Sequence, residues 1–414
     1  MAKGGIDLRT LSDANRIHIL KVIHEQKSIS RTELSCQTGL SLSAVSRIVK
    51  QLIEEGFVLE TGLGDSSGGR KPITICPNPD AGYVIGVDFG RTNANAGVFN
   101  FCGELVFQYV APIHGSAYLD GLYEAVDRCV ASLEDKSRLM LIYCGIRGYL
   151  DRNTGTILSS TTFGWKNIPL QELLTKRYSV PVGLDINARL AALGEWKTIY
   201  SDTVDDMVYV TTSWGICAGV ISRRELFRGS WGMAGEIGNT VNFLGDYIGP
   251  QYDLERSCGG QMLIRQAQEQ WNDSRNILLR KLTGCSSERV SVEDIVAAAN
   301  SGDEFVLELV HRAASVLALG LCNITYSYNP RVIVIGGLLS EMGDTVLRPV
   351  KKRLEEMLPE LVYNQLRVEL TVLGGRASLV GAAEAAFREV FTSPIADSGI
   401  RTNEYCSGNV GDPG

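Results

Sequence analysis

The sequence predicts an α/β protein with a small N-terminal helix-turn-helix domain, a β-hairpin wing and a larger α/β body. Three observations lead to this prediction. The first 75 residues hold three short helical patterns in quick succession, a hairpin pattern follows them, and the remaining chain alternates apolar strands with helices. The length of 414 residues allows two or three domains with buried cores.

Charge is distributed unevenly along this chain. The formal net charge is −7, but residues 1–75 carry ten basic and eight acidic side chains, whereas the rest carries 30 basic and 39 acidic ones. Because the body is acidic, we do not expect the chain as a whole to bind polyanions in general. The mildly basic head permits contact with nucleic acid at one end only.

Nothing in the sequence predicts export or membrane insertion. The N-terminus lacks the apolar stretch of a signal peptide, and we expect no run of the roughly 18 apolar residues that a membrane span requires. The longest apolar candidate, residues 332–339, is interrupted by glycines and is interpreted as a buried strand. The ten cysteines lack CxxC or CxC spacing, as is typical of reduced thiols. We therefore expect a cytoplasmic protein.

The head begins with three helical segments. A first helix is predicted over residues 12–25, and Ser30 with Glu33 forms the capping-box pattern that opens a second one. Gly39 is a natural left-handed C-cap for that helix, and Ser41 can cap a third. The apolar positions of the third helix recur at helical spacing; they are Leu42, Val45, Ile48, Val49, Leu52 and Ile53.

The other face of the third helix has the composition of a DNA-recognition helix. Small side chains let the backbone approach the major groove, and basic ones reach guanine edges or phosphates. The alternative is an ordinary solvated helix face, but the tandem of short helix, tight turn and longer helix favours DNA. The predicted contact residues of the three-helix region are Arg31, Thr32, Ser41, Ser43, Ala44, Ser46, Arg47 and Lys50.

A β-hairpin is predicted after the third helix. Residues 56–61 indicate a strand, residues 62–69 a Gly/Ser/Asp loop, and residues 70–75 a return strand. Arg70 and Lys71 at its tip can enter a minor groove or bind a phosphate. A flexible basic linker is the alternative interpretation. We place the winged domain at residues 1–76 and a linker at residues 77–82.

The body contains strand ends that suit a nucleotide or sugar site. One strand ends in the pattern Asp-x-Gly-x-Thr, formed by Asp88, Gly90 and Thr92, in which the carboxylate can orient a metal-bound water and the threonine can donate to a phosphate. Another ends at Asp185, immediately before an alanine-rich helix. That carboxylate can act as a general base or can simply cap its helix.

At these residues the sequence resembles the ROK family of repressors and sugar kinases. The matching segments are residues 30–34, 38–41 and 68–72 in the head, and 87–92, 181–195, 232–238 and 330–337 in the body. The resemblance implies an actin-like, ribonuclease H-like fold with two α/β lobes and a ligand cleft between them. We assign the lobes to residues 83–195, completed by residues 375–392, and to residues 196–374, followed by a polar tail at residues 393–414.

The sequence departs from the family's kinases at several positions. Trp214, followed by Gly215, stands where those kinases have the small hydroxyl residue of a phosphate hairpin, so we expect its indole to obstruct a terminal phosphate. Asn239 replaces a zinc-binding histidine, and residues 243–253 contain no cysteine, which leaves no tetrahedral zinc site. Leu184 replaces a sugar-binding asparagine, and Arg147 a proline. From these changes we expect that the protein binds no metal and no cofactor and has no catalytic residue. Asp185 would be catalytic only if the protein were a kinase.

The resemblance also suggests a retained effector site. Its predicted residues, aligned with the family's sugar-binding region, are Gly164, Trp165, Asp185, Glu236, Asn239 and Glu255. The alternative is that these carboxylates are now structural. We expect a homodimeric or homotetrameric repressor of operator DNA, either sugar-responsive or constitutive. The alternatives are an ATP-dependent sugar kinase and a module whose head binds protein.

Overall fold

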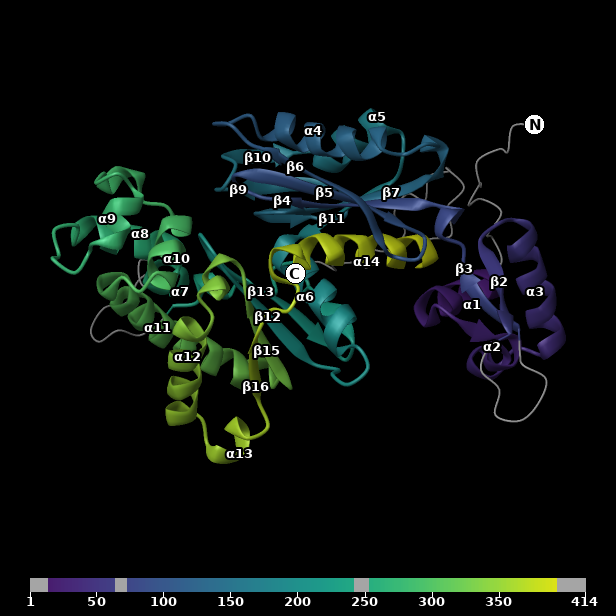
Figure 1. Ribbon diagram of the computed structural model, residues 1–414. Coiled ribbons are helices and arrows are strands. Elements are labelled where there is room, and N and C mark those ends of the chain that lie inside the picture. The colour runs from purple at the N-terminus through teal and green to yellow at the C-terminus, as the bar shows by residue number, and fades with distance from the viewer. Residues whose placement is uncertain (1–13, 64–72, 242–252, 393–414) are drawn as a thin grey trace, which may run out of the picture. The chain divides into compact units, whose positions relative to one another are not determined.

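The computed structural model describes residues 14–63, 73–241 and 253–392 (Figure 1). These residues fall into two compact units, which are described separately. The first unit comprises residues 1–81 with residues 388–414, and the second comprises residues 82–387. The first unit therefore ends after the short 3-10 helix Pro79–Ala81, inside the segment expected as a linker, and it includes the end of the last helix of the chain.

The first unit is a winged helix-turn-helix. Its elements are α1 (Ala14–Gln26), β1 (Ile29–Ser30), α2 (Arg31–Thr38), α3 (Leu42–Glu54), β2 (Val58–Leu63) and β3 (Ile73–Pro77). The strands form an antiparallel sheet in the order β1-β3-β2. Ser30 and Glu33 form both bonds of the capping box, Gly39 ends α2 in the left-handed region with φ 71°, and the Ser41 hydroxyl accepts from the amide of Ala44. These local bonds set the angle of the helix-turn-helix.

The core of this unit is formed by one apolar face from each helix. Val45, Ile48, Val49 and Leu52 of α3 are buried, as the helical spacing predicted. Leu42 is 50% exposed, so its assignment to the buried face was wrong. It lies in the first turn of α3, beyond the reach of the core, where helical periodicity does not decide exposure.

The second unit begins with a five-stranded sheet. Its strands are β4 (Tyr83–Phe89), β5 (Asn93–Asn100), β6 (Leu105–Pro112), β7 (Leu139–Ile146) and β11 (Val182–Ile186). Their spatial order is β11-β7-β4-β5-β6, in which β11, β7 and β4 are parallel and β5 and β6 are antiparallel additions. A small antiparallel sheet of β8 (Tyr149–Asp151), β9 (Thr156–Ser160) and β10 (Trp165–Ile168) lies alongside.

Helices cover both faces of this first-lobe sheet (Figure 1). The helices α4 (Tyr118–Ala131) and α5 (Leu170–Tyr178) lie on one face, and α14 (Ala377–Thr392) lies on the other. Between the two lobes runs α6 (Asn187–Glu195), in which every residue is buried. Gly194 of α6 and Gly381 of α14 face each other so closely that a Cβ on either would meet the backbone of the other helix.

The second lobe repeats the strand order of the first. Its strands β12 (Met207–Thr212), β13 (Ile216–Ser222), β14 (Glu225–Phe227), β15 (Val332–Gly336) and β16 (Arg367–Leu370) are arranged as β14-β13-β12-β15-β16. Two sheets with the same order of antiparallel and parallel strands form the predicted actin-like body. Its remaining helices are α7 (Leu254–Cys258), α8 (Gly260–Glu269), α9 (Leu278–Leu282), α10 (Val292–Asn300), α11 (Glu304–Tyr328), α12 (Asp344–Met357) and α13 (Glu360–Tyr363).

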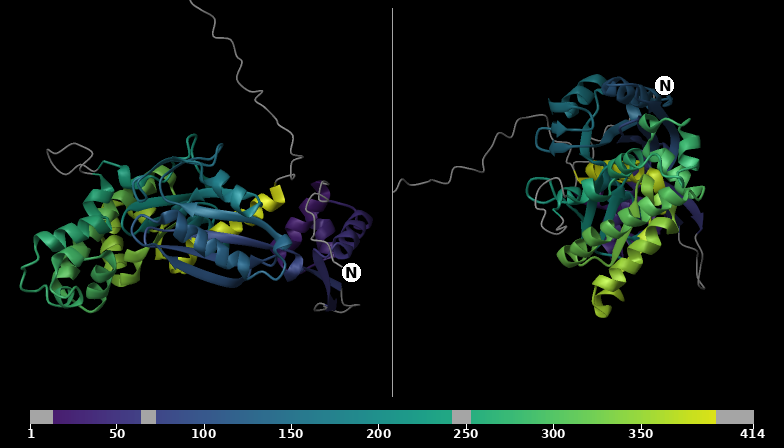
Figure 2. Two further views of the ribbon diagram at one scale, coloured as in Figure 1. Left: turned by 90° about the horizontal axis from the view of Figure 1, so that it is seen from above. Right: turned by 90° about the vertical axis from the view of Figure 1, so that its left-hand side faces the viewer.

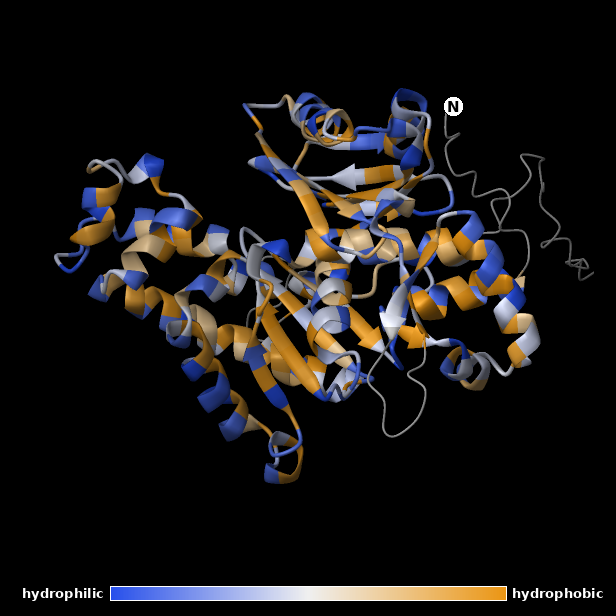
Figure 3. Ribbon diagram, turned by 45° about the vertical axis from the view of Figure 1, so that its right-hand side comes forward, coloured by the Kyte–Doolittle hydropathy of each residue, from blue (hydrophilic) through white to orange (hydrophobic). Residues whose placement is uncertain are grey.

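Most of the helices of the second lobe gather at one end of the second unit (Figure 2). The central one, α11, is long and apolar enough to cross a membrane by length and composition, which the sequence analysis had not expected. Its buried side chains, including Phe305, Leu309 and Leu321, belong to the core between the helices and β15, so α11 is a core helix here. Along the helices, hydrophilic and hydrophobic residues alternate (Figure 3), as is usual for helices with one face in the core.

Candidate functional site

The first candidate surface lies on α3 in the winged domain. Ser43, Arg47 and Lys50 are exposed, and Ala44 and Ser46 are partly exposed, so the face predicted to contact DNA points to solvent. Lys50 makes only a loose ion pair with Glu54, 3.8 Å away, with both side chains well exposed. Such a pair constrains the lysine little, which leaves its ammonium group available to a phosphate. The exposed Leu42 adds an apolar side chain that the sequence analysis had not counted on this face.

A second basic residue of the predicted DNA surface is already engaged within the domain. The guanidinium group of Arg31, at the start of α2, lies 2.5 Å from the carboxylate of Glu60 on β2. This ion pair connects the helix-turn-helix to the wing. The predicted wing-tip residues Arg70 and Lys71 lie outside the described residues.

In the body, Asp185 is enclosed by two arginines. Its side chain is fully buried at the end of β11, and its carboxylate accepts from Arg189 at 3.1 Å and from Arg228 at 2.8 Å. The amide of Ile186 donates a third bond at 2.8 Å. Asp185 was expected to bind an effector or to act in catalysis. In the structure, both of its carboxylate oxygens accept hydrogen bonds from the protein itself. Neither arginine was predicted as a site residue; they follow Asp185 by 4 and 43 residues.

The two segments predicted as a vestigial phosphate site do come together. Arg91, in the turn between Gly90 and Thr92, places its guanidinium group 4.4 Å from the centre of the Trp214 ring. Asp88 lies at the end of β4, where burial raises the pKa of its carboxyl, opposed by the nearby charge of Arg147. A cation–π contact therefore joins the two lobes at these segments.

An acidic cluster forms around the predicted sugar motif. Glu236 accepts from the Asn239 amide at 3.4 Å, and its other oxygen lies 3.7 Å from the Cys217 sulfur. Glu255 accepts from the amide of Ile216 at 2.8 Å. Burial is the main cause of the raised pKa of Glu236; the charge of Glu255 also raises it, and that of Arg189 opposes the shift. Three of the predicted effector residues, Glu236, Asn239 and Glu255, thus share one site.

The cluster includes a residue that the sequence analysis missed. The hydroxyl of Tyr149, on β8 of the first lobe, interacts with Asn239 and lies near Glu236 and Glu255. Burial and then the charge of Glu236 raise the pKa of this phenol, so it stays protonated and can donate a hydrogen bond. The residue stands 87 positions before Glu236, and no local pattern connects the two.

The remaining predicted effector residues serve the first lobe. Trp165 packs in an aromatic group with Phe89 and Phe163, at ring-centre distances of 5.8 and 4.9 Å. Gly164 precedes it with φ 66°, which favours glycine at this turn. Both residues therefore shape the aromatic group at the start of β10, where Trp165 remains partly exposed.

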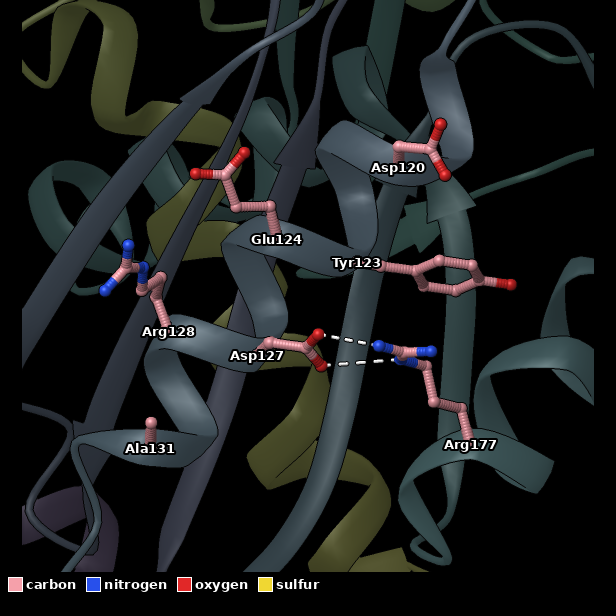
Figure 4. A pocket seen from close by; sticks show the side chains of 7 residues that line it. All are labelled: Asp120, Tyr123, Glu124, Asp127, Arg128, Ala131 and Arg177. Atoms are coloured by element: carbon pink, nitrogen blue, oxygen red, sulfur yellow. Dashed lines mark hydrogen bonds and ion pairs between the residues drawn. The ribbon is translucent and has the colours of Figure 1, made fainter.

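A cavity of about 540 Å³ lies elsewhere, on the outer face of α4 and α5 (Figure 4). It is lined by Asp120, Tyr123, Glu124, Asp127, Arg128, Ala131 and Arg177. Arg177 binds Asp127 through two bonds and covers the Tyr123 ring at 4.5 Å. Arg177 and Asp127 thus pair with each other at the surface, and we assign the cavity no ligand. Among the described residues, no group of three or more His, Cys, Asp or Glu side chains is arranged to hold a metal ion.

Comparison with protein families identifies the body and the head separately. Residues 84–389 match the model of the ROK family, and residues 12–58 match a model of winged helix-turn-helix DNA-binding domains. The first match covers most of the chain. The chain belongs to the ROK family.

Relatives of this ROK protein include both regulators and kinases. The xylose repressor of Caldicellulosiruptor bescii is 28% identical over 93% of this chain and 98% of its own length. The ROK glucokinase of Streptomyces griseus, solved with glucose and AMPPNP, is 28% identical with a TM-score of 0.65, covering 74% of this chain and all of its own. A ROK transcriptional regulator described as a homologue of the E. coli MLC protein has a TM-score of 0.75 at 21% identity, covering 93% of this chain and 99% of its own, and shares the fold.

The raised pKa of Glu236 predicts a pH-dependent effect of its removal. Because folding favours the protonated form of this carboxyl, its contribution to stability is most favourable at low pH and is lost as pH rises through the raised pKa. The Glu236→Gln variant should therefore melt at a higher temperature than the wild type at pH 7. The difference should shrink as the pH approaches the ordinary glutamate value of 4.5. Melting curves from pH 4.5 to 8 measure this, with the exposed Glu288→Gln as control. A difference that does not change with pH would contradict the assignment.

Proposed function

We propose that this ROK protein is a DNA-binding transcriptional repressor whose body binds a sugar and does not transfer phosphate. The observation that carries the proposal is the exposed face of α3, with Ser43, Arg47 and Lys50, in a winged helix-turn-helix joined to a ROK body. A helix of this composition fits the major groove, where arginine reads guanine and lysine binds phosphate. The full-length similarity to a protein named xylose repressor supports the same function.

The same proposal gives Arg31 a positioning role. Because its guanidinium group binds Glu60, Arg31 holds α2 against the wing strand and contacts DNA only indirectly. Leu42 takes a place on the reading surface, where its exposed side chain can contact a thymine methyl group. The protein acts in the cytoplasm as a homodimer or homotetramer, since two reading heads on paired half-sites gain affinity and specificity.

The sugar-binding part of the proposal rests on the cluster of Glu236, Asn239, Glu255 and Tyr149. Carboxylates accept hydrogen bonds from sugar hydroxyls, while the phenol and the amide donate, so the cluster offers both kinds of partner to a polyol. Tyr149 comes from the first lobe and the others from the second. A sugar bound among them would favour lobe closure, and the change in closure would be passed on to the operator-binding head.

Two features argue against phosphoryl transfer. A general base must reach the hydroxyl that it deprotonates, but the carboxylate of Asp185 is fully buried and bound by Arg189 and Arg228. The second feature is the contact of Arg91 with Trp214, which occupies the position between the phosphate-binding turns. Phosphoryl transfer depends on the positioning of the reacting groups and on stabilisation of the charge of the transferred phosphate. The contacts of Asp185 and of Trp214 alter both.

A coupled ADP-release assay with MgATP tests this directly. We expect no turnover above background with glucose, xylose, mannose or N-acetylated amino sugars, while a ROK glucokinase in the same assay gives a normal rate. Turnover that is abolished by Asp185→Asn would overturn the proposal and make the protein a kinase. A background rate in the wild type beside a normal rate in the glucokinase supports the proposal.

Operator binding separates the repressor from a head that binds protein. The full-length protein should bind a fragment of its own upstream region, and the affinity should fall steeply with salt because phosphate contacts release counterions. Binding without salt dependence would contradict the DNA interface. If a broad sugar panel leaves the operator affinity unchanged, the constitutive form of the repressor holds instead of the sugar-responsive one.

A further inference from the structure

One arginine–aromatic contact crosses from one lobe of the body to the other. Arg91 lies in the turn between β4 and β5 of the first lobe, and Trp214 lies in the turn between β12 and β13 of the second. Within the described residues, the other such contacts each stay inside one lobe. They are Arg128 with Tyr109, Arg177 with Tyr123 and Tyr178, Arg224 with Trp196, Arg280 with Trp271, and Arg367 with Tyr200.

The turn that carries Trp214 is fixed within the second lobe. The carbonyl oxygens of Ser213 and Trp214 accept from the first two amides of α8, those of Gly260 at 2.9 Å and Gln261 at 3.3 Å. The Ser213 hydroxyl accepts from the amide of Leu338 at 2.9 Å, which connects the same turn to the segment after β15. The indole is also partly buried against the core of this lobe. The second lobe therefore determines where the ring lies.

Among the described residues, Arg91 has no competing partner in its own lobe. The arginine is exposed in a tight turn, which the amide of Gly90 closes by donating to the carbonyl of Asn93 at 2.9 Å. Its guanidinium group forms no ion pair with any described carboxylate and lies 4.4 Å from the centre of the Trp214 ring. An exposed arginine side chain has many accessible rotamers, so its place on the indole reflects attraction between the cation and the ring.

We propose that Arg91 and Trp214 form a clasp that holds the two lobes of the body together when no ligand is bound. This inference goes beyond the proposed function, because it concerns the body without DNA or sugar. A cation–π contact at an exposed site is weak, so the clasp favours the closed arrangement of the lobes and still lets them separate. From the usual strength of such contacts, its loss should increase the open population roughly two- to fivefold.

A cysteine of the second lobe can report whether the lobes are closed. Cys217, on β13, packs against the hydrophobic core of the first lobe and is partly buried there. Burial raises the pKa of its thiol. Alkylation requires the thiolate, so Cys217 should react chiefly when the lobes separate and its cover is removed. The rate of this reaction therefore measures the open population.

The test compares alkylation of Cys217 by iodoacetamide in the full-length wild type, Arg91→Gln, Arg91→Lys and Arg128→Gln, with each labelled cysteine identified by mass spectrometry. Arg128→Gln is the matched control, since Arg128 is also exposed and its guanidinium group lies 5.4 Å from the Tyr109 ring inside the first lobe. We expect Cys217 to react about two- to fivefold faster in Arg91→Gln, at an intermediate rate in Arg91→Lys, and at the wild-type rate in Arg128→Gln. The exposed Cys285 should react at the same rate in all four proteins.

A second pair of variants tests whether Arg91 acts through the indole. Removal of the ring in Trp214→Leu already breaks the clasp, so adding Arg91→Gln to Trp214→Leu should not accelerate the alkylation of Cys217 further.

Three outcomes would overturn the inference. Equal rates at Cys217 in the wild type and Arg91→Gln would show that the contact does not hold the lobes together. The same acceleration by Arg91→Gln with and without the Trp214 indole would show that the arginine acts on something else. An equally large rise at Cys129, which is buried in the core of the first lobe, would reflect loosening of that lobe rather than separation of the two.

Discussion

Replacement of Arg189 by methionine is expected to lower the free energy of unfolding of the body by roughly 3 kcal/mol. The Arg189 side chain is almost completely buried, and it binds Asp185 and the carbonyls of Gly232 and Ala234. Methionine fills a similar volume but offers no donor. In the variant, the buried carboxylate of Asp185 keeps only one arginine partner, and the carbonyls of Gly232 and Ala234 each lose a hydrogen-bond donor. Losing these partners is costly in a low-dielectric interior.

Urea unfolding of the full-length protein, followed by circular dichroism and tryptophan fluorescence, measures this effect. Arg353→Met is a matched control, since Arg353 pairs with Glu356 at the surface with both side chains about half exposed, and it should cost less than 1 kcal/mol. Adding Asp185→Asn to Arg189→Met should recover part of the loss, because the buried charge is then gone. If Arg189→Met lowers the free energy of unfolding no more than Arg353→Met does, Arg189 does not stabilise the buried carboxylate of Asp185 in solution.

Replacement of Arg47 by alanine is expected to weaken specific operator binding by about 1–3 kcal/mol, which corresponds to roughly 5- to 150-fold. Arg47 is exposed on α3, next to the buried residue Ile48, and we expect its guanidinium group to contact a base edge in the major groove. Because the side chain is exposed, its removal should leave the melting temperature unchanged. Titration of a labelled operator fragment measures the affinity.

Two further variants distinguish base reading from simple charge. Lys50→Ala should weaken binding to specific and unrelated DNA by similar factors and reduce the slope of the salt dependence by about one, as expected for a phosphate contact. Lys352→Ala, in the exposed part of α12 of the body, should change neither. If Arg47→Ala binds its operator as tightly as the wild type, Arg47 does not read the DNA; if Lys352→Ala weakens binding as much, the interface lies on the body.

The ROK body has the fold shared by ROK kinases, and its buried carboxylate Asp185 is bound by arginines. Asp185 keeps its place at the end of β11, but Arg189 and Arg228 take up its charge. Arg189 in turn binds the carbonyl of Gly232. One buried arginine therefore connects Asp185 with the loop that leads to Glu236, which is why we expect its replacement to lower stability.

The winged domain could be predicted almost entirely from the sequence because its signals are local. Ser30, Glu33, Gly39 and Ser41 act within one helical turn, and their hydrogen bonds depend only on neighbours in the chain. The exposure of Leu42 was missed for the opposite reason: apolar periodicity does not say where the core ends. The order of the family motifs likewise predicted the two-lobed fold.

What the sequence determined by itself was the set of elements of the winged domain, their caps and the family, since each of these depends on short-range spacing or on motifs read in order. The tertiary structure alone decided the state of the side chains at the site. It enclosed Asp185 between two arginines, packed Trp165 against aromatic rings, and brought Tyr149 to Asn239. These contacts join residues from different strands and lobes, and the charge and exposure of a side chain depend on every group that folding places around it.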